Sequence, residues 1–235
     1  MKTPLSRRRF LSSSSAAGLA ATTAALGSAV AADKAKKNNS LKILGVSCSP
    51  RKGMTTAKAV QAALDAARAV NPSVQVELLD LGGLDIAGWR GENQPEDDFT
   101  PLLPKFRDPT LGGLIIGSPC YFRSMSSLTK CFLERLAPLR KPEMVLANKP
   151  AGVVSVGAFR NGGQELTIQQ IHCVLLCYGM LPVGGHSPAF QGATLHSEND
   201  SIAEDELGLE TASQLGKRIA EIALLPTGAA KNTDH

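Results

Sequence analysis

The amino-acid sequence predicts an α/β fold in which helices wrap both faces of a parallel sheet. Short apolar runs of strand length alternate along the chain with longer segments whose apolar residues recur at helical spacing. Most of the short runs are apolar throughout, which is typical of parallel strands buried on both faces. The 235 residues, 43% of them hydrophobic and 20% charged, suffice for one globular domain with a sizeable core.

Five strands and five helices are predicted within residues 41–226. Apolar runs predict strands at Leu41–Val46, Val74–Leu79, Leu114–Ile116, Ala151–Val156 and, in a short version, Met180–Val183. Helical spacing predicts helices at Thr55–Val70, Phe99–Phe106, Ser126–Leu136, Glu165–Tyr178 and Asp205–Leu225. Asn71 and Pro72 end the first helix, and Pro101 and Pro104 restrict the second to a short one. Residues 80–98, rich in Gly, Asp and Glu, predict a long loop.

The first 31 residues are predicted to be an export signal outside this domain. S-R-R-R-F-L at Ser6–Leu11 resembles the twin-arginine signal, and Ala29–Ala31 ends the following apolar stretch with a small-x-small cleavage pattern. A membrane anchor is the alternative, but Ala, Ser and Thr dominate the stretch. We expect an exported, periplasmic protein without a stable membrane span. Residues 32–40 are predicted as a linker and residues 227–235 as a disordered tail.

Charge excludes one class of partner. The whole chain has a formal charge of +4, but residues 1–31 hold four basic residues and no acidic one. The chain that remains after cleavage has 21 basic and 21 acidic residues. A neutral domain offers no electrostatic basis for binding nucleic acid or an anionic membrane surface.

The chemistry is expected in the loops that follow the strands, since ligands of open parallel sheets bind beyond the carboxyl ends of the strands. The first loop, residues 47–56, contains neither G-x-G-x-x-G nor a P-loop. It instead holds hydroxyls and one guanidinium at Ser47, Ser49, Arg51, Thr55 and Thr56, followed by a helix N-terminus. Such a cage suits a phosphate monoester. A Ser/Thr-rich turn that merely caps the helix is the alternative.

The other two loops suggest a flat ring. Residues 117–125 place Tyr121 and Phe122 side by side in a protein that is only 4% aromatic. A heteroaromatic ring could stack there, although the two rings could also plug the top of the core. Residues 157–164, glycine-rich with Asn161, could approach the polar edge of a ring. Phosphate, flat ring and polar ring edge together describe flavin mononucleotide (FMN).

Three stretches in register resemble the NADPH-dependent FMN reductase family, in the branch of the iron–sulfur flavoproteins. They are L-K-I-L-G-V-S-C-S-P-R-K-G-M-T-T-A-K, G-L-I-I-G-S-P-C-Y-F-R-S-M-S-S-L-T-K-C-F-L-E-R and G-A-F-R-N-G-G-Q-E, and the resemblance spans Leu41–Gly185. It implies a flavodoxin-like fold with strand order 2-1-3-4-5, and a homodimer or homotetramer. It implies that the FMN phosphate is held by Ser47, Ser49, Arg51, Thr55 and Thr56. The ring would lie against Pro119, Cys120, Tyr121 and Phe122, and its far edge near Arg160, Asn161, Gly162 and Gly163.

The chain departs from the branch in its cysteines. The loop after the second strand contains none, so no iron–sulfur cluster is expected. Cys48 and Cys120 stand where the family commonly has other residues, and they follow strands that are neighbours in the implied order. They could form a disulfide or a redox relay beside the flavin, or simply pack as small residues.

The remaining cysteines are predicted to be core residues. Cys173 and Cys177 lie four apart on a predicted helix and, with His172, only weakly suggest a metal site. Cys131 is interpreted in the same way. The glycine-rich segment 186–196 could cover the site.

The sequence therefore predicts an exported FMN-dependent oxidoreductase that takes electrons from a small donor and passes them to a small acceptor such as a quinone. Two alternatives remain open. One is a flavin-binding electron carrier without a substrate of its own. The other is a metal-binding protein that uses Cys and His. No general acid or base is assigned.

Overall fold

The computed structural model describes residues 40–225. The predicted signal peptide, the linker up to residue 39 and the tail lie outside the described residues.

One mixed sheet forms the centre of the molecule. Its parallel strands are β1 (Leu41–Ser47), β2 (Val74–Asp80), β3 (Leu111–Tyr121), β5 (Pro150–Gly157), β6 (Leu181–Pro182) and β7 (Ala193–His196). They are ordered β2-β1-β3-β5, and β6 and β7 both pair with β5 at the far edge. The short strand β4 (Ser124–Met125) folds back on β3 and is antiparallel. Counted along the chain, the parallel strands confirm the predicted order 2-1-3-4-5, with the fifth place shared by two short strands.

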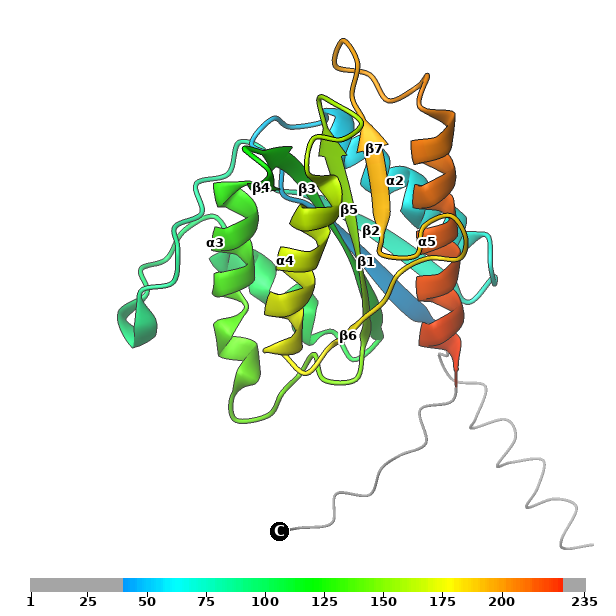
Figure 1. Cartoon of the computed structure of the whole chain (residues 1–235). Coiled ribbons are helices and arrows are strands. Elements are labelled where there is room, and N and C mark those ends of the chain that lie inside the picture. The colour runs from blue at the N-terminus through cyan, green and yellow to red at the C-terminus, as the bar shows by residue number, and fades with distance from the viewer. Residues whose placement is uncertain (1–39, 226–235) are drawn as a thin grey trace, which may run out of the picture. The chain divides into compact units, whose positions relative to one another are not determined.

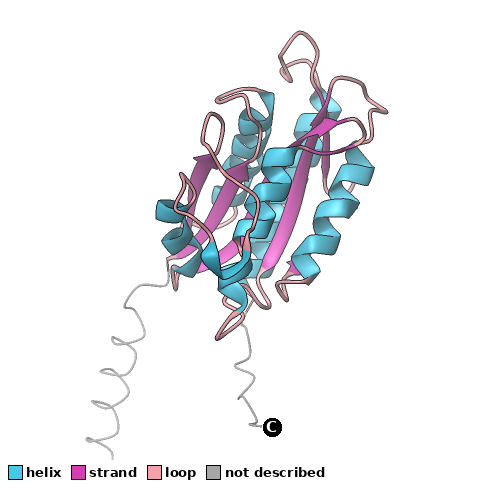
Figure 2. Cartoon of the chain, turned by 90° about the vertical axis from the view of Figure 1, so that its left-hand side faces the viewer, coloured by secondary structure: helices cyan, strands magenta, loops and turns pink. Residues whose placement is uncertain are grey.

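Helices cover both faces of the sheet, as Figures 1 and 2 show. The helices α2 (Thr55–Arg68) and α5 (Glu206–Leu224) pack on one face, and α3 (Ser127–Arg135) and α4 (Gln164–Leu176) on the other. Three 3₁₀ helices complete the described elements: Gly91–Asn93, Thr100–Arg107 and Ala137–Arg140. The second of these is the short helix that the prolines predicted.

Glycine brings two layers close together beneath the first loop. A Cβ atom added at Gly117 of β3 would stand 2.3 Å from Val60 Cγ2 and 3.0 Å from Thr56 Cγ2. Because only hydrogen fits there, α2 lies directly on the sheet. The N-terminus of α2 is therefore held against the carboxyl ends of β1 and β3.

One predicted strand boundary is wrong, and one strand of the sheet was not predicted. The third strand was expected at Leu114–Ile116 but extends to Tyr121, so the aromatic stretch belongs to a strand and its hairpin. The end of segment 186–196, for which no strand was predicted, forms β7 (Ala193–His196) in the sheet. These residues form a strand because their backbone pairs with β5, which lies about 40 residues earlier in the chain. A pairing over this distance leaves no pattern in the local sequence.

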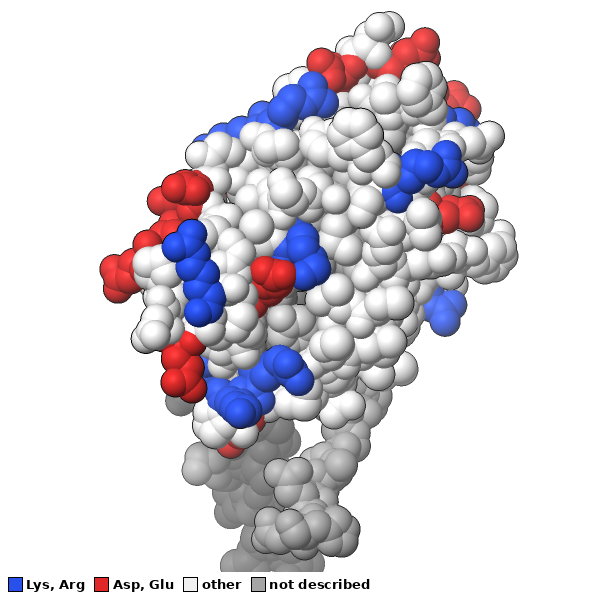
Figure 3. Space-filling model, turned by 60° about the vertical axis from the view of Figure 1, so that its left-hand side comes forward, with Lys and Arg blue, Asp and Glu red and all other residues white. Residues whose placement is uncertain are grey.

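Figure 3 shows positive and negative side chains interspersed around a broad area without charge. Among residues 40–225, no helix combines the length and apolar character needed to cross a membrane.

Candidate functional site

The carboxyl edge of the sheet, at the top of Figure 1, gathers the three predicted loops. In the strand register Ser47 of β1 pairs with Gly117 of β3, and Pro119 of β3 pairs with Val156 of β5. The residues that follow these strands are thereby neighbours in space. The backbones of the three loops therefore begin side by side at one edge of the sheet.

The first loop presents buried hydroxyls at the start of α2. Ser47, Ser49, Thr55 and Thr56 are all buried, and the hydroxyl of Ser47 has no hydrogen-bond partner within residues 40–225. Helix α2 begins at Thr55, and no side chain of the described region caps it at the N-cap residue, Met54. Its first-turn N–H groups therefore have no intrahelical acceptor and favour an anion.

The backbone of this loop is fixed by a carboxylate from the neighbouring strand. Asp80 Oδ2 accepts a hydrogen bond from Gly53 N at 2.6 Å, and Oδ1 accepts one from Gly82 N at 3.2 Å. On its other side, Cys48 N donates to Gly117 O at 2.9 Å. The loop is thus held from both flanking strands.

A buried cluster of hydroxyls locks the first loop to α3. Ser126 Oγ donates to Cys48 O at 2.8 Å, and Thr129 Oγ1 donates to Ser118 Oγ at 2.8 Å. Ser126 also caps α3 by accepting from Thr129 N at 3.1 Å. A buried polar network that is satisfied in this way makes its surroundings rigid.

Arg51, the predicted phosphate ligand, has a partner that the sequence did not reveal. Its Nη1 donates to Asp200 Oδ1 at 2.7 Å, and this hydrogen bond raises the pKa of the guanidinium. Asp200 sits at the tip of a tight turn closed by the bridge between Glu198 and Ser201. Both side chains of the pair are about half exposed, so a ligand phosphate can compete for Arg51.

The second loop is a two-residue hairpin turn that leaves its aromatic rings outside the core. Tyr121 pairs with Ser124, and Phe122 and Arg123 between them have φ angles of 51° and 63°. Tyr121 is 40% exposed and Phe122 is fully exposed. The alternative in which the two rings plug the core is therefore wrong.

The third loop is tied to the end of β3 through Cys120. The Cys120 thiol donates to Gly162 O at 3.3 Å and accepts from the hydroxyl of Thr167 at 3.3 Å. Gly163, which precedes α4, has a φ of 106°, and a Cβ there would stand 2.9 Å from Arg123 Cα. Only glycine fits this contact between the second and third loops.

Arg160, predicted to lie near the far edge of the ring, is held in an ion pair. Its guanidinium forms an ion pair with Asp205, which also accepts from His196 N at 2.6 Å and from Gly208 N at 2.9 Å. Burial alone would raise the pKa of Asp205, but these donors hold it below its usual value. Arg160 therefore fixes the third loop to the start of α5, while Asn161 beside it is exposed.

The cysteines differ from their predicted roles. All five lie in the described region and are free. Cys48 is fully buried, which raises the pKa of its thiol, whereas the Cys120 thiol contacts Gly162 and Thr167. Of the alternatives left open for this pair, the disulfide is therefore wrong. Cys173 and Cys177, predicted to be core residues, are both exposed.

A cavity beside the first loop was missed by the sequence analysis. It has a volume of about 410 Å³ and lies between Pro50, the loop after β2 and the start of α3, with Cys131 in its wall. Its position follows from the long loop 81–99, whose path depends on side-chain contacts that the sequence does not disclose.

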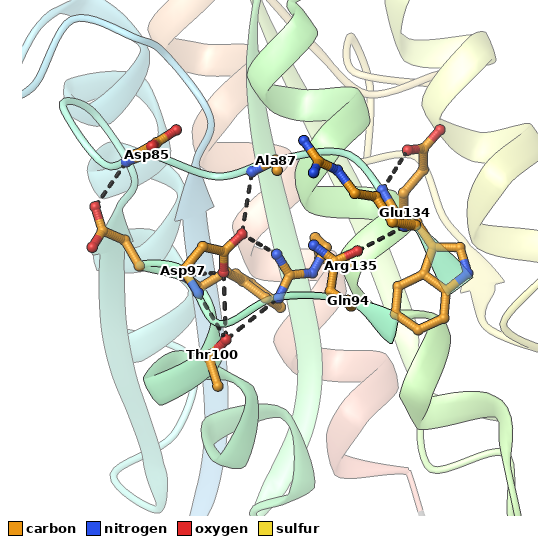
Figure 4. A network of polar contacts seen from close by, with 11 residues as sticks. Asp85, Ala87, Gln94, Asp97, Thr100, Glu134 and Arg135 are labelled. Atoms are coloured by element: carbon orange, nitrogen blue, oxygen red, sulfur yellow. Dashed lines mark hydrogen bonds and ion pairs between the residues drawn. The ribbon is translucent and has the colours of Figure 1, made fainter. Parts of the chain in front are cut away.

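Figure 4 shows what fixes that loop. Arg135 of α3, almost fully buried, forms an ion pair with Asp97, which also accepts from Ala87 N at 3.2 Å. Burial by itself would raise the pKa of Asp97, but these donors hold it below its usual value. Further along the loop, Trp89 N donates to Glu134 Oε2 at 3.1 Å. The cavity wall is therefore rigid.

Comparisons with known proteins agree with this geometry. The model of the NADPH-dependent FMN reductase family matches residues 41–194, and the chain belongs to this family. An iron–sulfur flavoprotein of Methanocaldococcus jannaschii is 36% identical over 195 residues, which cover 79% of this chain and 98% of that protein. An NAD(P)H dehydrogenase (quinone) of Paracoccus denitrificans is 29% identical over 164 residues, 63% of this chain and 76% of its own.

Among solved structures, a flavodoxin, the WrbA-like protein from Agrobacterium tumefaciens, superposes with a TM-score of 0.54 over 79% of this chain and 98% of that one. At 19% identity this likeness concerns the fold alone. Family and fold together define an FMN-dependent oxidoreductase.

The residues present fit one of the two cofactors that these relatives suggest. The unpartnered Ser47 hydroxyl and the uncapped start of α2 suit the phosphate of FMN. An iron–sulfur cluster needs grouped thiolates. Within residues 40–225 no three His, Cys, Asp or Glu side chains gather as metal ligands, so the donors do not fit a cluster.

Proposed function

We propose that this chain is an exported FMN-dependent oxidoreductase that passes electrons from a small donor to a small acceptor such as a quinone. The observation that carries the proposal is the buried Ser47 hydroxyl, which lacks a partner in the described region and lies beside the uncapped start of α2. A buried hydroxyl without a partner costs about 1–3 kcal/mol. A phosphate oxygen at this position would satisfy both the hydroxyl and the helix.

The phosphate group of FMN is assigned to the first loop. The proposed ligands are Ser47, Ser49, Arg51, Thr55 and Thr56. Arg51 exchanges its bond to Asp200 for the phosphate, and the helix N-terminus contributes about 0.3–1 kcal/mol. Asp80 holds the loop backbone in place during this exchange.

The ring of FMN is assigned to the ends of β3 and of the third loop. Pro119, Cys120, Tyr121 and Phe122 would form the surface under the ring, and Arg160, Asn161, Gly162 and Gly163 would lie near its polar edge. Cys120 keeps these two surfaces in register through Gly162 and Thr167. Arg160 acts through the position of the loop, because its guanidinium is held by Asp205. When bound, FMN supplies a ring that accepts and releases two electrons.

The cavity beside Pro50 offers a place for a small acceptor. It adjoins the first loop, and its wall combines apolar side chains such as Leu84 and Ile86 with polar groups such as Asp85 and Ser127 in comparable measure. The similarity to an NAD(P)H dehydrogenase (quinone) favours a quinone as the acceptor. A flavin-binding electron carrier remains the second proposal, and it requires no such cavity.

Export and assembly belong to the same proposal. The S-R-R-R-F-L stretch supports twin-arginine export to the periplasm. Exposed Phe122 and Phe159 at the carboxyl edge support a homodimer or homotetramer, because a second copy would cover both rings. Replacing Arg7 and Arg8 by lysine should keep the protein in the cytoplasm, and Phe122→Ser should lower the mass measured by light scattering.

The deciding experiment measures FMN and riboflavin binding by Arg51→Ala. The expected result is about a tenfold or greater loss of FMN affinity, typical of a charge-assisted hydrogen bond, with little change for riboflavin, which lacks the phosphate. Arg68→Ala is the matched control, since Arg68 pairs with Asp65 at the far end of α2. Equal affinity of Arg51→Ala and wild type for FMN would refute the phosphate assignment.

A turnover assay distinguishes an enzyme that reduces a small acceptor from an electron carrier. NAD(P)H or an artificial donor is supplied to the FMN-loaded protein with and without a quinone. Steady quinone reduction supports an enzyme. Reduction of the bound flavin that passes no further supports the electron carrier.

A further inference from the structure

Helix α4 exposes two thiols at the end that lies far from the flavin edge. Cys173 and Cys177 are both exposed and lie one turn apart, so they share one face of the helix. The Cys177 thiol points back to Cys173 O, at 3.8 Å, and thus toward the turn that carries Cys173. In Figure 1 this end of α4 lies at the lower end of the sheet, whereas the hairpin of β3 and β4 lies at the upper end. The pair therefore has no part in the site described above.

These two thiols cannot pair with each other while the helix is intact. Residues four apart in a helix have Cβ atoms about 5–6 Å apart, whereas a disulfide requires about 3.5–4.5 Å. Cys177 keeps helical backbone angles of −66° and −14°, so the last turn is not unwound. The dithiol is stable against internal oxidation.

The same separation fits a metal ion between two sulfurs. A metal–thiolate bond of about 2.3 Å places two sulfurs about 4.6 Å apart when the ion lies between them in line. Sulfurs carried on Cβ atoms about 5–6 Å apart reach this spacing by leaning toward each other. The carbonyl end of a helix also favours a cation.

Sulfur is the ligand type that these two side chains offer, and the segment that carries them is uncharged, whereas the neighbouring loop brings Glu143 and the basic Lys141. Residues 166–197 contain no Asp, Glu, Lys or Arg, so no carboxylate ligand for a hard ion and no competing cation lies in this stretch. Met144 is 43% exposed and packs against Gly179, two residues after Cys177: its Cε would stand 3.5 Å from a Cβ placed on Gly179. Thiolates and thioethers prefer Cu(I) among the metals of proteins.

We propose that Cys173 and Cys177 form a two-thiolate site for a soft monovalent cation, Cu(I), with the Met144 thioether beside it. Binding exchanges the two thiol protons for the ion and forms two sulfur–metal bonds, without any oxidation or reduction. The site is independent of the flavin.

The test is a competition titration with Cu(I) under anaerobic conditions. A chromophoric Cu(I) chelator reports how much ion the FMN-loaded full chain removes from it. The wild type should bind one equivalent per chain. Cys173→Ser and Cys177→Ser should each weaken binding at least about 100-fold, beyond the roughly 10–100-fold that an outer-shell change costs. Met144→Leu should weaken it less.

Cys131→Ser is the matched control, because Cys131 is a half-buried thiol on another helix. It should bind Cu(I) as the wild type does. Each variant's flavin absorbance reports that the fold is kept. Unchanged affinity in the two α4 variants would overturn the proposal. So would a wild type that takes up no Cu(I) but forms dimers linked through Cys173 or Cys177 on mild oxidation, which would make this face an interface between copies.

Discussion

Replacing Arg135 by methionine should destabilise the domain by about 3 kcal/mol, the lower end of the range for breaking a buried ion pair. The side chains of Arg135 and Asp97 are only 6% and 10% exposed. Methionine keeps the bulk but leaves the Asp97 carboxylate without its charged partner. Two backbone donors remain, Ala87 N at 3.2 Å and Phe99 N at 3.1 Å, and they keep the cost near the lower end. The guanidinium also lies 5.5 Å from the centre of the Phe99 ring, a contact worth about 0.5–1 kcal/mol.

The assay is thermal unfolding at a fixed FMN concentration and scan rate. For a domain of this size about 3 kcal/mol corresponds to a fall in Tm of roughly 6–12 °C. Lys130→Met is the matched control, since Lys130 forms an exposed pair with Glu134 on the same helix and should cost at most about 1 kcal/mol. The double variant Arg135→Met with Asp97→Asn should recover much of the loss, because no buried charge is left unpaired.

How the effect of Arg135→Met on stability depends on pH follows from the direction in which folding shifts the pKa of Asp97. The pKa of Asp97 is lowered in the folded protein, so its contribution is complete above the unfolded value near 3.8 and is lost as the pH falls below it. Without Arg135 the buried carboxyl protonates more easily. The gap in Tm between wild type and Arg135→Met should therefore narrow on acidification. A Tm within 3 °C of wild type at pH 7, or a double variant that loses the sum of both single effects, would refute the argument.

Three further predictions concern the carboxyl edge. Ser47→Ala should leave the flavin-free protein as stable or more stable, because it removes a buried hydroxyl without a partner in the described region, but should weaken FMN binding about tenfold; a drop in flavin-free stability above about 1 kcal/mol would contradict it. Gly117→Ala should cost about 1–3 kcal/mol, since the new methyl group meets Val60 Cγ2 at 2.3 Å, and chemical denaturation measures this. Asp80→Asn should loosen the first loop, which hydrogen exchange at Gly53 would report as faster exchange with the rest of the domain unchanged.

The parallel sheet and the place of the site were predictable because both depend on local signals. Apolar runs identify β1 and β5, and the rule that ligands bind beyond the carboxyl ends of strands then selects the loops after them. Strand β7 was missed because Ala193–His196 is only four residues long and is a strand by virtue of its pairing with β5. The Arg51–Asp200 pair joins residues 149 positions apart, which no local pattern encodes.

The exposure of the α4 cysteines could have been found from the sequence. Ile168, Ile171 and Leu175 recur at helical spacing and form the buried stripe. Cys173 and Cys177 lie off that stripe, on the other side of the helix. In the second half of the helix, residues 171–177, every residue except His172 is apolar, so composition alone conceals which face is buried there.

Two buried hydroxyls at the carboxyl edge cost stability, and FMN bound as proposed would offset part of that cost. In the described region the hydroxyls of Ser47 and Ser155 are buried without partners, near the ends of two strands of the same sheet. Each such group costs about 1–3 kcal/mol, a noticeable part of the roughly 5–15 kcal/mol that stabilises a domain. FMN at 100 times its Kd would add about 2.7 kcal/mol, because it binds only the folded state. Loading with FMN should therefore raise Tm in wild type, and raise it less in Ser47→Ala, where the hydroxyl that the ligand would satisfy is gone.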